Sequence, residues 1–393
     1  MDSAISPGIR MRCFEVLQRL LSKLHAQRAH PNRELHYDQL ITWLVLAYYN
    51  PTLQSLRALQ HASDDPVFQE RSGLQRFSLG SFSEATHVFD PQPLMEIFQE
   101  FAFKVHAQDA PARPASLPGH LSVLAVDASL WKALPRMARA FYHAPLTRCR
   151  KGGLKGHFLF DVLRATPVSC QLTAGCTDER QVLPRQLQAN CFYVLDRGYL
   201  SAALFEQISN AGGSFLTRLK ETSTWEVLEE RAVSEQAAAT GVKSDPRIRW
   251  QDRELRLVVA EREVAAPTNL HPRQKNGKHR AAPRERGLQR WLLITDRFDL
   301  SAEDVALLYA YRWHIEIFFR WLKSTLHCRH LFAESENGFA LQLYAALIAT
   351  LLVMLYSGRK PTRRLFEALS LYIQGWVSEE HIWRTLAKAP LQK

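Results

Sequence analysis

Twenty-seven consecutive residues without proline or glycine, at positions 304–330, constrain the fold of this chain more than any other stretch (DVALLYAYRWHIEIFFRWLKSTLHCRH). Because no helix-breaking residue interrupts them, they predict one continuous helix. At about 100° per residue, its polar side chains gather within an arc about 60° wide. These are Tyr309, Arg312, Glu316 and Lys323, with Arg320 and His327 at the border. The remaining surface is mostly aliphatic and aromatic, so we expect a largely buried helix with one polar stripe.

The stripe has two interpretations. A helix that packs on a core normally shows a solvated polar face, and the four side chains can be no more than that. A solvated face, however, usually carries many charges of mixed sign. Here a single carboxylate, that of Glu316, is flanked by cations and a tyrosine beside a wall of aromatic residues. This composition favours a functional site on the helix.

The overall charge indicates a polyanionic partner. The chain has 393 residues, 46% of them hydrophobic, and a formal net charge of +11. It is therefore globular and long enough for two or three domains. Such a charge suits nucleic acid first and an anionic membrane surface second. The six cysteines form no CxxC pair, which is typical of buried thiols in a reducing compartment.

One segment meets the length criterion for a membrane span. Residues 337–358 carry no charge, and an uncharged stretch of that length can cross a bilayer. The stretch stands alone, however, contains Gln342, Thr350 and two tyrosines, and directly follows another largely buried helix. We therefore interpret it as a core helix and expect no membrane association. The N-terminus lacks the apolar core and cleavage site of a signal peptide.

Changes in periodicity predict the domain organisation. Residues 1–106 have the pattern of several short helices and form either a module that binds DNA ends or a plain packing and dimerisation domain. Residues 107–119 are rich in proline and alanine and predict a linker. Residues 120–356 combine strands and helices in one domain, and residues 357–393 predict a basic helical tail.

The strands of the second domain follow from short apolar runs. Runs at 121–127, 155–163 and 167–175 predict an antiparallel meander that opens a mixed sheet, and strands at 190–196 and 213–220 follow. Residues from about 221 to 300 break this rhythm and predict a strand-rich insertion. Its basic loop at 270–290 either contacts phosphates or is merely solvated.

Two aspartates follow these apolar runs directly. Asp127 and Asp196 each end a predicted strand, and Glu316 comes from the helix expected to pack on that sheet. Side chains at strand ends gather at a crevice, although a single aspartate there is usually a turn former or a helix cap. Three carboxylates without soft ligands suit Mg²⁺ or Mn²⁺. Two such ions about 4 Å apart promote phosphoryl transfer, so the residues predict a metal-dependent phosphotransferase.

The same residues resemble a known family. Tyr309, Arg312, Glu316 and Lys323 reproduce the spacing of the Y-R-E-K signature of DDE-class insertion-sequence transposases. The stretch Asp196-Arg197-Gly198-Tyr199, with Phe215 and Arg218 downstream, is similar to that family's second acidic motif. Val126-Asp127-Ala128-Ser129 resembles its first motif.

This resemblance implies an α/β fold. Its core would be a ribonuclease-H-like mixed sheet with flanking helices, interrupted by a β-strand insertion and preceded by an all-α N-terminal DNA-binding domain. It also implies cut-and-paste transposition of an insertion sequence, with DNA as partner at its inverted-repeat ends and at the target. Two Mg²⁺ ions, replaceable by Mn²⁺, and a homodimeric synaptic complex belong to this expectation. The expected location is the bacterial cytoplasm, in association with the nucleoid.

The resemblance also assigns roles to residues. Asp127, Asp196 and Glu316 carry over as catalytic metal ligands. Tyr309, Arg312 and Lys323 carry over as contacts to the phosphates of the transposon ends, and Arg197, Tyr199 and Arg320 are further candidate DNA contacts. In relatives a tryptophan of the insertion can stabilise a flipped base beside a hairpin intermediate. The candidates here are Trp225, Trp250 and Trp291, of which Trp291 is the least favoured because it lies in a core-like strand.

Two other functions remain alternatives. The chain can be a transposase-derived DNA-binding protein that has lost cleavage, against which the intact acidic triad argues. It can also be another metal-dependent nuclease of the same fold, which cuts DNA but does not join a 3′-hydroxyl to a target.

Overall fold

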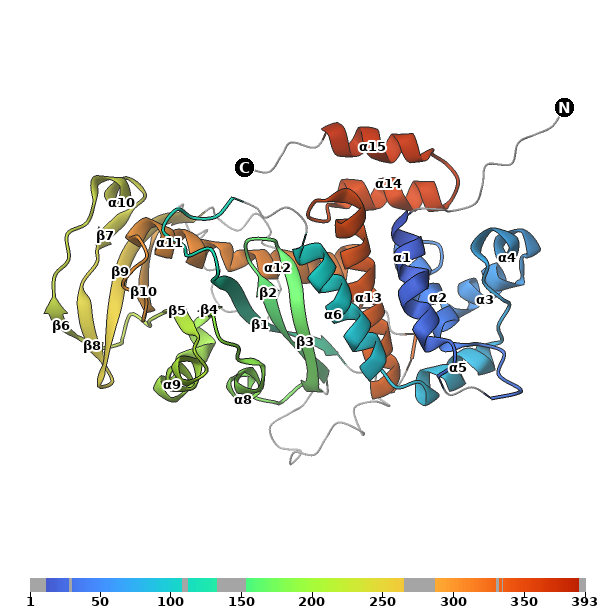
Figure 1. Ribbon diagram of the computed structural model, residues 1–393, viewed down its shortest axis with the longest axis horizontal. Helices are drawn as coiled ribbons and strands as arrows, with labels where there is room; N and C mark the ends of the chain where they lie inside the picture. Colours follow the sequence, from blue (N-terminus) through green and yellow to red (C-terminus); the bar gives the residue numbers. More distant parts are fainter. Residues whose placement is uncertain are drawn as a thin grey trace, which may run out of the picture. The chain divides into compact units, whose positions relative to one another are not determined.

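The computed structural model describes residues 12–27, 30–107, 112–132, 153–264, 287–329, 332–333 and 335–388. The chain divides into two compact units, whose elements are labelled in Figure 1. The first unit comprises Met1–Pro111, Ala128–Thr177 and His314–Lys393, and the second comprises Ala112–Asp127 and Asp178–Trp313. The domain boundaries expected from the sequence remain predictions.

The N-terminal part of the first unit is helical, as predicted. Its helices are α1 (Arg12–Leu21), α2 (Tyr37–Tyr49), α3 (Leu56–Asp64), α4 (Pro66–Ser72), α5 (Leu79–Val88) and α6 (Gln92–His106), with a short 3₁₀ turn, η1, at Ser22–Leu24. Side chains of Ser55, Asp65 and Ser78 accept hydrogen bonds from the first-turn amides of α3, α4 and α5. These caps satisfy backbone donors that a helix otherwise leaves unpaired, and so fix where each helix begins.

Helix α13 (Glu336–Ser357) is the core of the first unit. It is long and apolar enough to span a membrane, but 94% of its most apolar window is buried within the protein. Helices α2 and α6 pack against it, and the hydroxyl of Tyr48 on α2 donates to the carbonyl of Gln342 at 3.0 Å. The interpretation as a core helix agrees with this burial. Helices α14 (Arg363–Ile373) and α15 (Glu379–Lys388) follow it.

The first unit also contains a β-hairpin. Strands β2 (Gly153–Asp161) and β3 (Thr166–Ala174) pair antiparallel, with Leu154 opposite Ala174. Helices α6 and α13 both pack on β3, and Figure 1 shows the hairpin beside α6. Strand β1 (Ser122–Lys132) adjoins β2 and runs from the second unit into the first.

The second unit is built on a mixed sheet. Its strand order is β1-β4-β5-β10-β9-β8-β6, and β7 pairs with β9. Strands β4 (Cys191–Leu195) and β5 (Ser214–Arg218) continue β1 in parallel, and β10 (Gly287–Thr295) adds antiparallel to β5. The short helices are α8 (Glu179–Val182), the 3₁₀ turns η2 (Leu183–Gln186) and η3 (Arg197–Tyr199), α9 (Ala202–Asn210) and α10 (Glu235–Ala239).

The insertion is rich in strands. It contains β6 (Glu226–Glu229), β7 (Val242–Ser244), β8 (Arg247–Trp250) and β9 (Arg253–Val264). Most of the basic loop expected at 270–290 lies outside the described residues. Together with the mixed sheet, the flanking helices and the helical N-terminal region, the insertion confirms the fold class predicted from the sequence.

Two structural expectations are wrong in detail. Strand β1 does not end at Asp127 but continues to Lys132, and only its pairing with β4 ends at Val126. The helix expected at 304–330 is divided into α11 (Ala302–Tyr311), α12 (Trp313–Arg320) and a π-helical turn, η4 (Trp321–Thr325). No proline or glycine marks the break at Arg312, so the sequence carries no local signal for it.

The helical stretch is also less buried than expected. Leu307, Trp313 and Ile317 are exposed to 38%, 51% and 48%. The π turn ends with Leu326 donating its amide to the carbonyl of Trp321, and His327 then takes a left-handed conformation with φ 54°. Such wide turns occur often at functional positions. Here the turn contains Lys323. The rotation of 100° per residue that placed Lys323 on the polar stripe therefore does not hold up to this residue.

Candidate functional site

Asp127 and Asp196 are brought side by side by the parallel pairing of β1 and β4. The last register pair of these strands is Val126 opposite Leu195, and each aspartate is the next residue. Val126 and Leu195 are buried, whereas both aspartates are partly exposed. The apolar strands therefore deliver two carboxylates to one edge of the sheet in the second unit, where ligands commonly bind.

Arg312 faces the first of these carboxylates. Its Nη1 lies 3.8 Å from Oδ2 of Asp127, and the two side chains are only 13% and 24% exposed. The arginine is the C-terminal cap that follows α11, and its amide donates to the carbonyl of Tyr309 at 3.2 Å. The structure thus places Arg312 of the Y-R-E-K signature beside Asp127 of the first acidic motif.

Tyr309 is buried beside the same site. Burial raises the pKa of its hydroxyl, the charge of Arg312 opposes this shift, and the charge of Asp196 adds to it. Its ring meets that of Trp291 edge to face, with centroids 5.3 Å apart. The guanidinium of Arg262 lies over the Trp291 ring at 5.6 Å. The side chains of Tyr309, Trp291 and Arg262 therefore form an aromatic and cationic cluster next to the two aspartates.

The tryptophans of the insertion differ in access. Trp250 is buried at 5% exposure and packs on Phe205, so its faces are already covered. Trp225 is partly exposed immediately before β6. Trp291 is also partly exposed and lies next to Tyr309. Trp225 and Trp291 therefore both keep accessible surface, and the choice among the three tryptophans remains a prediction.

Tyr199 links a further carboxylate to the site. Its side chain is 2% exposed, and its hydroxyl pKa is raised by burial and by hydrogen bonding and charge at Glu179, with Asp127 and Asp196 contributing. Glu179 is the first residue of α8 and was not singled out from the sequence. No sequence signal marks it, because only the fold brings α8 next to η3.

A third strand-end aspartate shows why the sequence pattern is not sufficient. Asp296 follows the apolar strand β10 as Asp127 and Asp196 follow theirs. Because β10 is antiparallel to β5, its end lies at the opposite edge of the sheet, where Asp296 accepts the amide of Phe215 at 2.9 Å. Burial raises its pKa to about 6. Its carboxylate thus links the end of β10 to the backbone of β5.

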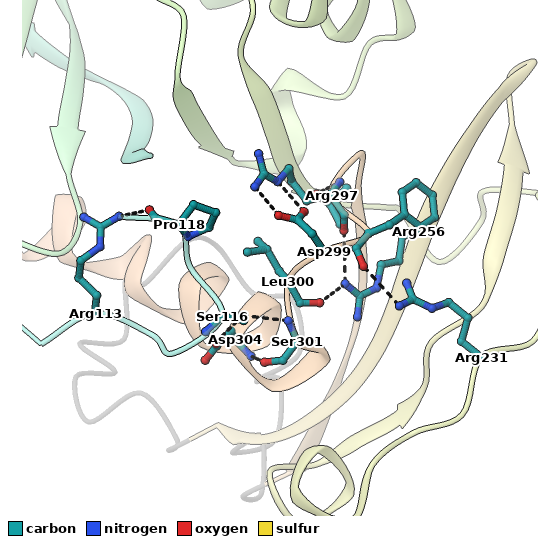
Figure 2. Close-up of polar contacts among 12 residues, drawn as sticks. Arg113, Ser116, Pro118, Arg231, Arg256, Arg297, Asp299, Leu300, Ser301 and Asp304 are labelled. Carbon is teal, nitrogen blue, oxygen red and sulfur yellow. Dashed lines mark hydrogen bonds and ion pairs between the residues drawn. The ribbon is translucent and has the colours of Figure 1, made fainter. Parts of the chain in front are cut away.

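The loop before α11 is firmly anchored, as Figure 2 shows. The guanidinium of Arg256 donates to both oxygens of Asp245 at 2.6 and 2.8 Å and to the carbonyl of Leu300 at 2.5 Å. Ser301 caps α11, and Ser116 donates its amide and hydroxyl to Asp304 in the first turn at 3.0 and 2.6 Å. These contacts fix the start of the helix that carries Tyr309 and is capped at its C-terminus by Arg312.

The first unit carries the remaining predicted residues. Glu316 is partly exposed on α12, between buried Ile315 and exposed Ile317, and Arg320 is exposed at the end of α12. Lys323 donates to the carbonyl of Leu130 at 2.8 Å, and its ammonium lies 4.6 Å from the centre of the Trp131 ring. Burial and the charge of Arg329 lower the pKa of Lys323. Arg197 is exposed in the second unit at η3.

The donor set at the acidic edge suits a hard cation. Asp127 and Asp196 offer carboxylate oxygens, the ligands that Mg²⁺ and Mn²⁺ prefer. Among the residues that the structure describes, no group of three or more His, Cys, Asp and Glu side chains is arranged to hold a metal ion. The second unit therefore supplies two of the three predicted ligands, and the third, Glu316, belongs to the first unit.

Comparison with known proteins gives a consistent result. The sequence profile of the family described as "Transposase DDE domain" matches residues 118–352. The chain is 26% identical over 219 residues to the "Probable transposase for insertion sequence element IS5377" of Geobacillus stearothermophilus, covering 56% of this chain and 52% of the relative. It is 28% identical over 198 residues to the "Putative transposase y4zB" of Sinorhizobium fredii, covering 50% of this chain and 51% of the relative.

The matches cover different shares of each protein. The chain spans about half the length of the curated relatives it matches. Among solved structures, the piggyBac transposase synaptic complex with hairpin DNA is similar, with a TM-score of 0.41 and 11% sequence identity. That match covers 96% of this chain and 79% of the other.

Proposed function

This chain belongs to the transposase DDE domain family, as the resemblance of its motifs predicted, and from this premise we propose that it is a DNA transposase. It would excise an insertion sequence at its inverted-repeat ends and join it to target DNA. The observation that carries the proposal is the juxtaposition of Asp127 and Asp196 at the ends of two paired strands, with Arg312 3.8 Å from Asp127.

The proposed chemistry is phosphodiester hydrolysis followed by transesterification. Asp127, Asp196 and Glu316 would hold two Mg²⁺ ions, or Mn²⁺ in their place, and the metal supplies Lewis-acid activation of the attacking and leaving oxygens. A water attacks the end phosphate, the bond to the 3′-oxygen breaks, and a 3′-hydroxyl is released. That hydroxyl then attacks a target phosphate and displaces a target 3′-oxygen.

Basic and aromatic side chains would position the DNA. Arg312 and Lys323 suit phosphate oxygens. Arg320, within the same Y-R-E-K stretch, and Arg197, in the second acidic motif, are exposed cations. Tyr309 and Tyr199 are both buried, so any contact they make with DNA is through the hydroxyl edge. We further propose that a homodimer assembles the two ends and that the protein works on the bacterial nucleoid in the cytoplasm.

Two alternatives differ from this proposal in what they cleave or join. A DNA-binding protein derived from a transposase would bind ends without cutting them. Another nuclease of this fold would cut without strand transfer. Incubation of the protein with end DNA, Mg²⁺ and a plasmid target separates the three, because only a transposase yields joined product.

The decisive variant is Asp127→Asn, which keeps the size of the side chain and removes the charge. We expect end binding close to wild type and loss of cleavage on the order of a thousandfold. Asp296→Asn is the matched control, because Asp296 also follows a strand but lies at the opposite edge. Normal cleavage by Asp127→Asn would contradict the proposed function.

A further inference from the structure

A second basic site lies in the first unit, around the buried carboxylate of Asp161. Asp161 ends β2 and is 1% exposed. Its Oδ1 accepts the amides of Leu163 and Arg164, both at 2.9 Å. Its Oδ2 lies 3.1 Å from Nη1 of Arg164 and 3.3 Å from Nδ1 of His106 at the end of α6. Both oxygens of the carboxylate are therefore already engaged.

Further basic side chains lie near this carboxylate or beside the residues that follow it. Lys360, from the loop between α13 and α14, is partly buried and is attracted electrostatically by Asp161. His314 on α12 lies 2.9 Å from the carbonyl of Val162 through Nδ1, and the charge of Lys360 helps to lower its pKa. Nε of Arg164 is buried and has no hydrogen-bond partner within the described residues. Burial lowers the pKa of the His106 and His314 imidazoles, so the cations that face the single carboxylate of Asp161 are Arg164 and Lys360.

The chain adds more positive charge just beyond Lys360. Arg363 and Arg364 are the first two residues of α14, follow its cap Thr362 and are exposed, and no acidic residue lies in this first turn. The N-terminus of a helix carries partial positive charge, so cations there are unfavourable unless an anion is present. Arg363 is compensated by Glu367 at 2.9 Å.

We propose that these side chains form a binding site for the phosphodiester backbone of DNA, distinct from the acidic edge of the second unit. The Asp161 basic cluster is defined as Arg164, Lys360 and the imidazoles of His106 and His314, and the exposed Arg364 follows Lys360 four positions later in the chain. A polyanion fits it better than a single small anion, because the cations continue along the chain from the half-buried Lys360 to the exposed Arg363 and Arg364. The proposal rests on the proposed function for the identity of the ligand.

Duplex DNA binding by the full chain tests the cluster. Lys360→Gln with Arg364→Gln removes two cations and leaves Arg164 and its bond to Asp161 intact. Each lost phosphate contact should lower the slope of log affinity against log salt by about 0.9, so we expect a change of about 2. The control is Lys104→Gln with Arg384→Gln, which removes two cations already paired with Glu100 and Glu380.

Chemical labelling localises the contact. Acetylation of lysine amines is measured by mass spectrometry with and without duplex DNA, and DNA should protect Lys360 but not Lys104. If millimolar inorganic phosphate protects Lys360 and duplex DNA does not, the cluster is a small-anion site and the proposal is wrong. An unchanged salt slope in a folded double variant, with Lys360 equally reactive in both states, also overturns it.

The outcome is separable from that of the proposed function. Asp127→Asn tests cleavage and leaves the cluster untouched, whereas the double variant is assayed for binding alone. A protein that binds duplex DNA through the cluster but never cleaves would retain this inference and lose the proposed function. If the double variant still cleaves end DNA and its salt slope is unchanged, the proposed function is retained and this inference is lost.

Discussion

The guanidinium of Arg312 and the carboxylate of Asp127 are 3.8 Å apart in the DNA-free chain. If Asp127 is a metal ligand and Arg312 a phosphate contact, each of these roles competes with the pairing. A phosphate that binds Arg312 would draw it from Asp127 and leave the carboxylate to a cation. DNA binding and metal binding would then favour one another, as coupling between two sites requires.

The first prediction follows from this competition. Arg312→Gln should weaken binding of end DNA and tighten binding of Mn²⁺ in the absence of DNA. Partly exposed ion pairs contribute up to about 1 kcal/mol, which corresponds to roughly a fivefold gain in metal affinity. Calorimetric titration of the DNA-free protein with Mn²⁺ measures this gain in metal affinity. Arg180→Gln, which breaks an exposed pair with Asp178 in the same unit, is the control and should change neither affinity.

The second prediction concerns Trp291. Its partly exposed ring beside Tyr309 and under Arg262 offers a surface on which a flipped base can stack. Stacking on an aromatic ring contributes about 1–3 kcal/mol per base, so Trp291→Ala should slow steps that need the flipped base by roughly tenfold or more. First-strand nicking should be nearly normal. A 2-aminopurine placed at the flipped position should fluoresce more in the variant, and equal fluorescence would exclude the stacking role.

The third prediction concerns the anchor of α11. Arg256 and Asp245 are 1% and 5% exposed and form two hydrogen bonds. Arg256→Met leaves a buried carboxylate without its partner, which costs about 3–5 kcal/mol. Urea denaturation followed in the second unit should therefore show a much lower midpoint. Arg249→Met breaks the exposed pair with Glu226 and should have little effect. Similar midpoints for both variants would show that the buried pair does not stabilise this region.

The sequence predicted the parts of the site that depend on local pattern. Apolar runs located β1 and β4, and the residues after their register pairs are the two aspartates. The same pattern occurs at Asp296, and only strand direction, which is a property of the whole sheet, separates it from the others. Local pattern therefore finds candidate strand ends but does not choose between the two edges of a sheet.

Other parts of the site depend on contacts between distant segments. The interaction of Tyr199 with Glu179 brings α8 to η3, and no periodicity encodes it. The break at Arg312 and the π turn at Lys323 also have no local signal. In the structure Lys323 bonds to Leu130 on β1, about 190 positions earlier in the chain. Helical geometry alone placed Lys323 on a stripe and could not predict this contact.

The last prediction separates the roles of two residues on this helical stretch. Glu316→Gln keeps the shape of the side chain and removes its charge, which weakens metal ligation. If Glu316 is the third ligand, the variant should bind end DNA like wild type and lose cleavage in Mg²⁺ by on the order of a thousandfold or more. Glu303→Gln makes the same chemical change in the first turn of α11 and should cleave normally.

Lys323→Ala should behave differently. If Lys323 exchanges its bond to Leu130 for a phosphate, its loss should weaken end binding, lower the salt slope by about one, and leave residual cleavage at saturating protein. We therefore expect opposite results from the two variants. Glu316→Gln should retain DNA binding and lose cleavage, whereas Lys323→Ala should bind DNA less tightly and retain part of its cleavage. Normal cleavage by Glu316→Gln would show that Glu316 is not a metal ligand, because a metal ligand cannot lose its charge without effect. The polar stripe would then be only the solvated face of a helix that packs on the core.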